Sequence, residues 1–103
     1  MSQAVAGTFA SGNSAGIGQT SAELMIPSGA VVMKLTAGGA IDASNTVKLQ
    51  FSTDGGQSWT DGDTYNTAQA GTEITVAHGE VWRLFSVAAQ ALKEIPYVLS
   101  VES

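Results

Sequence analysis

The chain has 103 residues, a formal net charge of −5 at pH 7 and no cysteine, and only 13% of its residues are charged, against roughly 25% in ordinary globular proteins. The four basic residues are scattered, which excludes a surface for nucleic acid, and no apolar run approaches the ~18 residues of a membrane span. Disulfide bonds are excluded too, so a domain of this size depends on its own core or on association with other protein.

Strands with a two-residue period are predicted along most of the chain. Apolar side chains alternate with polar ones, as in half-buried strands. The first two segments are short and weak, whereas four of the later five alternate clearly; the exception is 81–87. The predicted strands are 5–9, 22–26, 31–37, 46–52, 72–77, 81–87 and 97–103, with one more short strand around Trp59.

Turn-forming residues separate these strands. Small residues and glycines with access to positive φ mark turns at 26–29, 37–45, 54–56, 61–63 and 77–80. Seven to eight short strands with this spacing predict an all-β fold, a single antiparallel β-sandwich of Ig-like or jelly-roll-like type. We expect residues 1–20 to form a flexible N-terminal arm or loop with a short first strand, and residues 21–103 to form the sandwich.

The stretch QFSTDGGQSWT at residues 50–60 specifies a hairpin. Asp54 is placed to accept hydrogen bonds from the backbone N–H groups that follow it. Gly55 and Gly56 supply backbone conformations that other residues resist. Trp59 is expected to bury most of its ring over the hairpin, and Ser52 to close it from the opposite strand. These five residues therefore have structural roles.

The strand at 81–87 is apolar on both faces. Trp82 and Leu84 share one face, which we assign to the core. The other face predicts contact with a partner or a central strand of two layers. The candidate interface consists of Val81, Arg83, Phe85 and Val87.

The residues offer little for catalysis or metal binding. His78 is the only histidine and lies in a predicted turn. Asp54, Asp61 and Asp63 are close in sequence but do not match a calcium-binding loop, so we interpret them as turn residues. We expect no enzymatic activity, no catalytic residues, no metal and no cofactor. Exposed aromatic residues would instead indicate a sugar-binding platform, for which the candidates are Trp59, Trp82, Tyr65 and Tyr97; we expect both tryptophans in the core.

Two resemblances rest on the hairpin. Ser52, Asp54, Gly56 and Trp59 match the Asp-box of sialidases, in which the motif recurs once in each blade of a propeller. Here it occurs once, in a chain too short for a propeller. A wider stretch resembles a group of small tailed-phage virion proteins. The matching positions are Val47, Leu49, Ser52, Asp54, Gly55, Gly56, Trp59, Gly79, Trp82, Arg83 and Leu84, with Glu80 and Val81 as an insertion before the aromatic residue.

The phage resemblance implies a structural role in a virus particle, as a capsid decoration or cement protein. The implied partners are the major capsid protein and sister subunits in a homotrimer, with neither nucleic acid nor membrane. The N-terminal residues lack a signal-peptide pattern, so we expect synthesis in the host cytoplasm and a final place in the virion. Two alternatives stay open: a carbohydrate-binding or adhesin-type module of a tail fibre, and a head or tail completion ring subunit.

Overall fold

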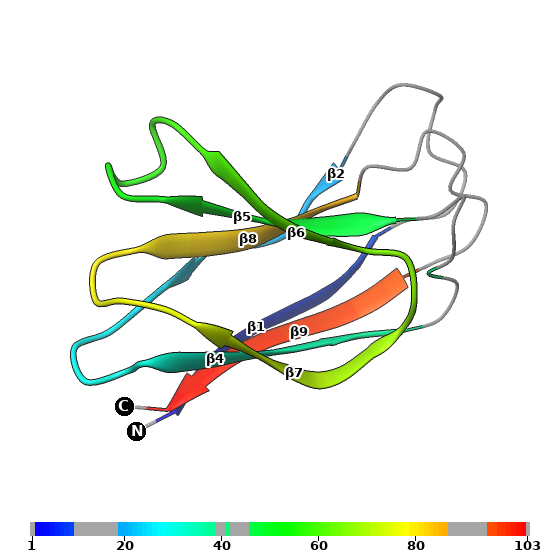
Figure 1. Ribbon diagram of the computed structural model, residues 1–103, viewed down its shortest axis with the longest axis horizontal. Coiled ribbons are helices and arrows are strands. Elements are labelled where there is room, and N and C mark those ends of the chain that lie inside the picture. Colours follow the sequence, from blue (N-terminus) through cyan, green and yellow to red (C-terminus); the bar gives the residue numbers. More distant parts are fainter. Residues whose placement is uncertain (1, 10–18, 39–40, 42–45, 87–94, 103) are drawn as a thin grey trace.

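Two antiparallel sheets pack face to face in the computed structural model, which describes residues 2–9, 19–38, 41, 46–86 and 95–102 (Figure 1). No helix in this part of the chain is long and apolar enough to cross a membrane. The strands are β1 (Ser2–Phe9), β2 (Gln19–Thr20), β3 (Leu24–Met25), β4 (Val32–Ala37), β5 (Val47–Ser52), β6 (Thr60–Tyr65), β7 (Gln69–Thr75), β8 (Val81–Ser86) and β9 (Ile95–Glu102).

The strand order is that of a jelly roll. One sheet has the order β1-β9-β4-β7, and the other has β2-β8-β5-β6 with β3 also paired to β8. The pairs are nested along the chain: β1 pairs with β9, β2 and β3 with β8, β4 with β7, and β5 with β6. This nesting is what a long hairpin rolled into two layers produces. The predicted β-sandwich is confirmed, and the order selects the jelly roll over the Ig-like arrangement.

The core lies between the sheets and is formed by the apolar side chains that the predicted alternation places inward. Met33, Leu35, Leu49, Leu84 and Leu99 are fully buried or nearly so, and the residues between them on each strand face outward. Burying each of these side chains contributes roughly 1.5–3 kcal/mol. The inward faces predicted for 46–52, 72–77 and 97–103 are confirmed.

The N-terminal segment belongs to the sandwich. β1 pairs along all of its eight residues with β9, from Ser2 opposite Glu102 to Phe9 opposite Ile95. The sandwich therefore begins at β1 rather than at residue 21, and the Gly/Ser-rich stretch 11–18 lies outside the described residues. Sequence reasoning underestimated this strand because its alanines and glycine give little hydrophobic contrast.

The neighbouring edge of the second sheet is a broken strand. β2 and β3 both pair with β8, and Ser21 bridges the interruption between them. The Ser21 N–H donates to the carbonyl oxygen of Leu84 at 2.8 Å, and the Leu84 N–H donates to Ser21 Oγ at 2.8 Å. The break explains why the described part of the chain forms nine strands where seven to eight were expected.

The predicted turn at 61–63 is wrong, because these residues lie within β6. Lys48 pairs with Thr64 whereas Gln50 pairs with Asp61, so the register shifts by a bulge opposite Leu49. Gly62 suits this bulge, because a Cβ there would lie 3.4 Å from the Leu49 Cβ. An Asp-Gly-Asp sequence is typical of turns, and only the pairing with β5 makes it extended.

The structure also places Val31 differently from the prediction. The alternation of 31–37 places it inward with Met33, but Val31 precedes β4 and is 66% exposed. Its carbonyl oxygen accepts a hydrogen bond from the Val76 N–H at 3.0 Å. The expected turns on either side of this region are present, with positive φ at Gly29 and Gly79.

Gly7 lies so close to Tyr97 that a larger residue at this position is expected to destabilise the fold. An alanine Cβ at Gly7 would lie 2.6 Å from the Tyr97 hydroxyl oxygen, and that oxygen accepts a hydrogen bond from the Ala22 N–H. We expect Gly7→Ala to lower the free energy of unfolding by about 1–3 kcal/mol, because the buried tyrosine must move. Urea unfolding followed by tryptophan fluorescence measures this. Gly38→Ala is the control: within the described residues nothing lies within 4 Å of its Cβ position, so a change above about 0.5 kcal/mol there would contradict the argument.

Candidate functional site on the outer face of β8

The hairpin between β5 and β6 is organised by two side chains. Ser52 is buried at the end of β5, and its Oγ accepts hydrogen bonds from the N–H groups of Gly56 at 2.8 Å and Asp54 at 3.3 Å. The same hydroxyl donates to Asp54 Oδ1 at 2.6 Å. Ser52 thus closes the hairpin, as the sequence predicts.

The Asp54 carboxylate accepts the remaining hydrogen bonds of the turn. Oδ1 accepts from the backbone N–H groups of Gln57 at 3.1 Å and Ser58 at 2.9 Å, and Oδ2 accepts from the Ser58 hydroxyl at 2.5 Å. The hydrogen bonds from the Ser52 and Ser58 hydroxyls, in that order, hold the pKa of Asp54 far below its usual range. The carboxylate is therefore ionised across physiological pH.

The two glycines of the hairpin both have positive φ. Gly55 has φ of 79° and Gly56 has φ of 97°, conformations that a side chain would strain. The Gly56 carbonyl oxygen accepts a hydrogen bond from Trp59 Nε1 at 3.1 Å. The hairpin therefore holds the indole of Trp59 in place through its own backbone.

Trp59 is only half-buried, contrary to the expectation that it belongs to the core. Its ring lies on the outer side of the sheet, and the Arg83 guanidinium carbon is 3.8 Å from the ring centroid. Trp82 takes the core position instead, with 6% of its surface exposed and its ring stacked on Phe51. Its Nε1 donates to Glu80 Oε1 at 3.1 Å. The two tryptophans thus have opposite environments because they lie on opposite faces of one sheet.

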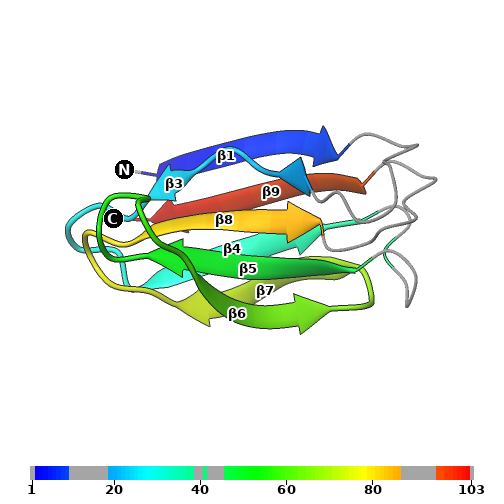
Figure 2. The ribbon, with the colours of Figure 1, turned by 90° about the horizontal axis from the view of Figure 1, so that it is seen from above.

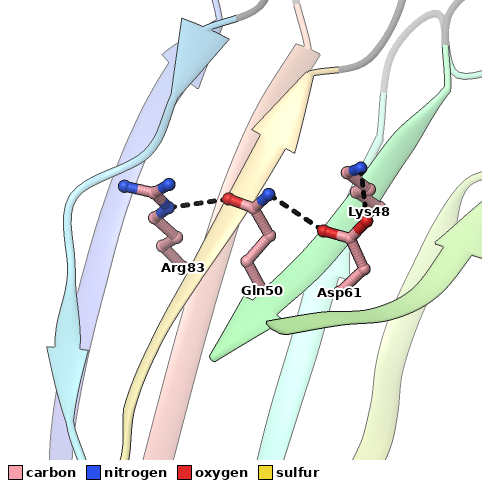
Figure 3. Close-up of polar contacts among 4 residues, drawn as sticks. All are labelled: Lys48, Gln50, Asp61 and Arg83. Atoms are coloured by element: carbon pink, nitrogen blue, oxygen red, sulfur yellow. Dashed lines mark hydrogen bonds and ion pairs between the residues drawn. The ribbon is translucent and has the colours of Figure 1, made fainter. Parts of the chain in front are cut away.

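A row of polar side chains crosses the outer face of three strands, β6, β5 and β8 (Figure 3). Lys48 Nζ and Asp61 Oδ2 are 2.9 Å apart, and Gln50 Nε2 donates to Asp61 Oδ1 at 3.1 Å. Arg83 Nε donates to Gln50 Oε1 at 2.8 Å. The hydrogen bonds from Lys48 and Gln50 lower the pKa of Asp61. These four residues, called the polar row below, form one connected network with Trp59 at its end.

The expected interface residues on β8 have different environments. Phe85 is half-buried on the outer face, with Lys48 Nζ 5.4 Å from its ring centroid. Arg83 shares that face, as expected, and its described partner is an amide rather than a carboxylate. Val81 is only 3% exposed, so it offers no surface to a partner. Val87 lies outside the described residues.

Sequence reasoning missed Lys48, Gln50 and Asp61 as members of this site. The alternation of β5 does place Lys48 and Gln50 outward together. What was missing was Asp61, because its assignment to a turn separated it from β5. A bulged edge strand with a single hydrophobic residue, Tyr65, leaves no periodic signal by which to find it.

The acidic residues near the hairpin do not converge on one point. Asp54 is bound within its turn, and Asp61 belongs to the polar row. Among the described residues, no group of three or more histidine, cysteine or acidic side chains is placed to hold a metal ion. His78 is exposed beside Gly79.

Trp82 and Tyr97 are buried, so the four aromatic candidates form no common sugar-binding platform.

The opposite sheet has a shallow hollow of about 330 Å³ on its outer face. It is lined by Val31, Val32, Lys34, Glu73 and Glu102, among others. Val32 pairs with Thr75 and Lys34 with Glu73 across β4 and β7. The hollow mixes apolar side chains with one cation and two carboxylates, and it has no connection to the polar row on the other sheet.

Comparison with known proteins adds no assignment: no family model, curated protein or solved structure matches the chain.

Because the two tryptophans lie in opposite environments, replacing each with alanine is expected to lower the stability by different amounts. Trp82→Ala is expected to lower the free energy of unfolding by about 3–5 kcal/mol, because a large buried ring leaves a cavity. Trp59→Ala should cost about 2 kcal/mol, since only part of its ring is removed from water. Chemical denaturation of both variants, followed by far-UV circular dichroism, measures the difference. Equal losses would contradict the placement of Trp59 outside the core.

The Asp54 hydrogen bonds predict a dependence of stability on pH. The folded-state pKa is lowered from 3.8, so the stabilisation is fully present above that value and is lost as pH falls through the lowered pKa. We expect Asp54→Asn to melt below the wild type at pH 7, with a gap that narrows below about pH 4. Melting curves from pH 7 to 2 test this. Asp63→Asn, on the adjacent strand β6, is the control. A difference in melting temperature between Asp54→Asn and the wild type that does not change with pH would refute the explanation.

Proposed function

We propose that this chain is a non-enzymatic structural protein of a tailed-phage particle, one that decorates or cements the capsid. The resemblance of residues 47–103, including the closing stretch YVLSVES, to small virion proteins suggests the particle. The observation that carries the proposal is the polar row beside Phe85, on the outer face of the β8 sheet. Its partners would be the major capsid protein and sister subunits, and its place would be the virion.

The charged side chains of the polar row already have contacts within the chain. Lys48 and Asp61 form an ion pair, whereas Arg83 donates to the Gln50 amide and lies against the Trp59 ring. A partner that covers this face would therefore bury the Lys48–Asp61 pair at reduced cost, while the positive charge of Arg83 would be left for the partner to compensate. The side chains are also held in place before binding, so less conformational entropy is lost on association. Such a face suits permanent contact with protein.

The residues that carry the phage resemblance act together in the fold. Ser52, Asp54 and Gly56 build the hairpin, the hairpin positions Trp59, and Trp59 stacks on Arg83 of β8. The matched positions therefore have a mechanical task, which fits a structural protein. Jelly rolls occur both in viral capsid proteins and in lectins, so the fold alone does not choose between them.

The half-exposed Trp59 supports a sugar-binding module as the second candidate function. Indole rings stack on sugars through their faces, but one face of Trp59 is occupied by the Arg83 guanidinium at 3.8 Å. A single half-buried ring offers less than the several exposed aromatic residues of a typical glycan platform. A subunit of a head or tail completion ring would use the same outer face of the β8 sheet. It would differ from a decoration protein by binding the head–tail junction instead of the capsid lattice.

Co-sedimentation with bare capsids tests the decoration proposal. The wild-type protein should pellet with capsids assembled from the major capsid protein of the same virus. Phe85→Asp should weaken this binding at least tenfold, because the carboxylate would be desolvated only in the assembled state. The fold should tolerate it, because Phe85 lies half-buried on the outer face beside Lys48 rather than in the core. Val98→Asp is the matched control, at a 38% exposed position on the opposite sheet.

The outcomes separate the candidates. Loss of binding by Phe85→Asp with normal binding by Val98→Asp supports the interface. Equal binding by both variants would place the interface elsewhere. A wild-type protein that ignores capsids and binds a glycan array would reject decoration in favour of the sugar-binding module.

A further inference from the structure

The edge strands of the two sheets differ in how strongly their sequences disfavour pairing with another chain. An edge strand presents unpaired N–H and C=O groups, which invite pairing with another chain unless charges, bulges or interruptions prevent it. Among the described strands, the edges are β1 and β7 in one sheet, and β6 and the β2–β3 strand in the other. Figure 2 shows β1 along one rim of the sandwich and β6 and β7 along the other.

Three of these edges carry protective features. β6 has Asp61 and Asp63 and is bulged opposite Leu49. β7 has Glu73, and its pairing with β4 is interrupted by a register shift next to Gly71, whose φ is 73°. The edge formed by β2 and β3 is broken into two pairs of residues. Each feature disfavours the addition of a further strand.

β1 carries none of these features. It is eight residues long, has no charged residue and no proline, and pairs with β9 in a continuous register. No described strand pairs with its other side. Its outward-facing Ala4, Ala6 and Thr8 are small and exposed, so they leave room for a neighbouring strand.

We propose that β1 pairs antiparallel with β1 of a second copy of this chain. The net charge of −5 makes two copies repel one another, so they associate best where no acidic side chain is brought close. Pairing through β6 or β7 would bring Asp61 and Asp63, or Glu73, against the same residues of the other copy. Pairing through β1 brings only neutral side chains together.

Two-fold symmetry limits the register of this pair. Opposed residues in an antiparallel pair project on the same face, so the two-fold axis must place a residue opposite its own copy. An axis at Val5 sets Ala4 opposite Ala6, and an axis at Ala6 sets Ala4 opposite Thr8. Both registers juxtapose small side chains, and both join the two four-stranded sheets into one continuous sheet. The unpaired backbone groups of β1 would then be satisfied.

This inference does not rest on the phage assignment, because it uses only the strand edges and charges of the chain. Sedimentation equilibrium of the wild-type protein is expected to give twice the chain mass of 10.5 kDa. A two-fold pair also differs from the homotrimer that the resemblance implies. A single-chain mass at the highest soluble concentration, or a three-chain mass, would overturn the proposal.

The decisive variant carries Ala4→Lys and Ala6→Lys. It sets lysines opposite one another with an axis at either Val5 or Ala6, and like charges in that position destabilise a strand pair. The dimer dissociation constant should rise about tenfold or more. The two lysines reduce the net charge from −5 to −3, which by itself would favour association, so a loss of dimer must come from the local contact.

The matched control carries Ala70→Lys and Thr75→Lys, at exposed positions on β7, the opposite edge of the same sheet. It has the same net charge and should remain a dimer. Dissociation of both variants, or of neither, would overturn the pairing through β1. Melting curves establish that each variant is folded.

Amide hydrogen exchange of the wild-type protein tests the proposal without any substitution. As the protein concentration rises, exchange should slow at alternate residues of β1 and stay constant in β6 and β7. Exchange in β1 that does not depend on concentration would reject the pair even if the lysine variant failed to fold.

Discussion

Pairing between strands that are far apart in the sequence is the constraint on which this structure depends. β1 pairs with β9 and β4 with β7, whereas β5 and β6 are joined by a hairpin. Neither sheet is stable alone, since each has one apolar face that must be covered. With no cysteine for a disulfide, the burial of side chains such as Leu35, Leu49 and Leu99 between the sheets holds both layers together.

The outer face of the β8 sheet follows from this arrangement. Once Trp82 and Leu84 point into the core, Arg83 must point outward, next to Gln50 of β5. The hairpin after β5 then brings Trp59 back over the same face, where it meets the guanidinium. The polar row is thus a consequence of strand register, and its four side chains are already in contact before any partner arrives.

The distribution of charge gives the surface of the molecule three distinct regions. The face with the polar row holds the Lys48–Asp61 ion pair, the edge strands β6 and β7 carry acidic residues, and β1 carries no charge. Contact with another protein is least costly at the first and third of these regions, for different reasons. On the polar row, Lys48 and Asp61 already compensate one another, whereas on β1 only backbone groups and small side chains meet a neighbour.

The sequence by itself determined the β class, the inward faces of most strands and the hairpin at 52–59, because these depend on local alternation and turn chemistry. Ser52, Asp54 and the two glycines act as their spacing predicts. Only the tertiary structure decided the jelly-roll order, the strand at Asp61 and the half-exposed place of Trp59. Each of these depends on which distant segment lies alongside: a two-residue period states that a side chain faces one way, but not what lies on either side of the sheet.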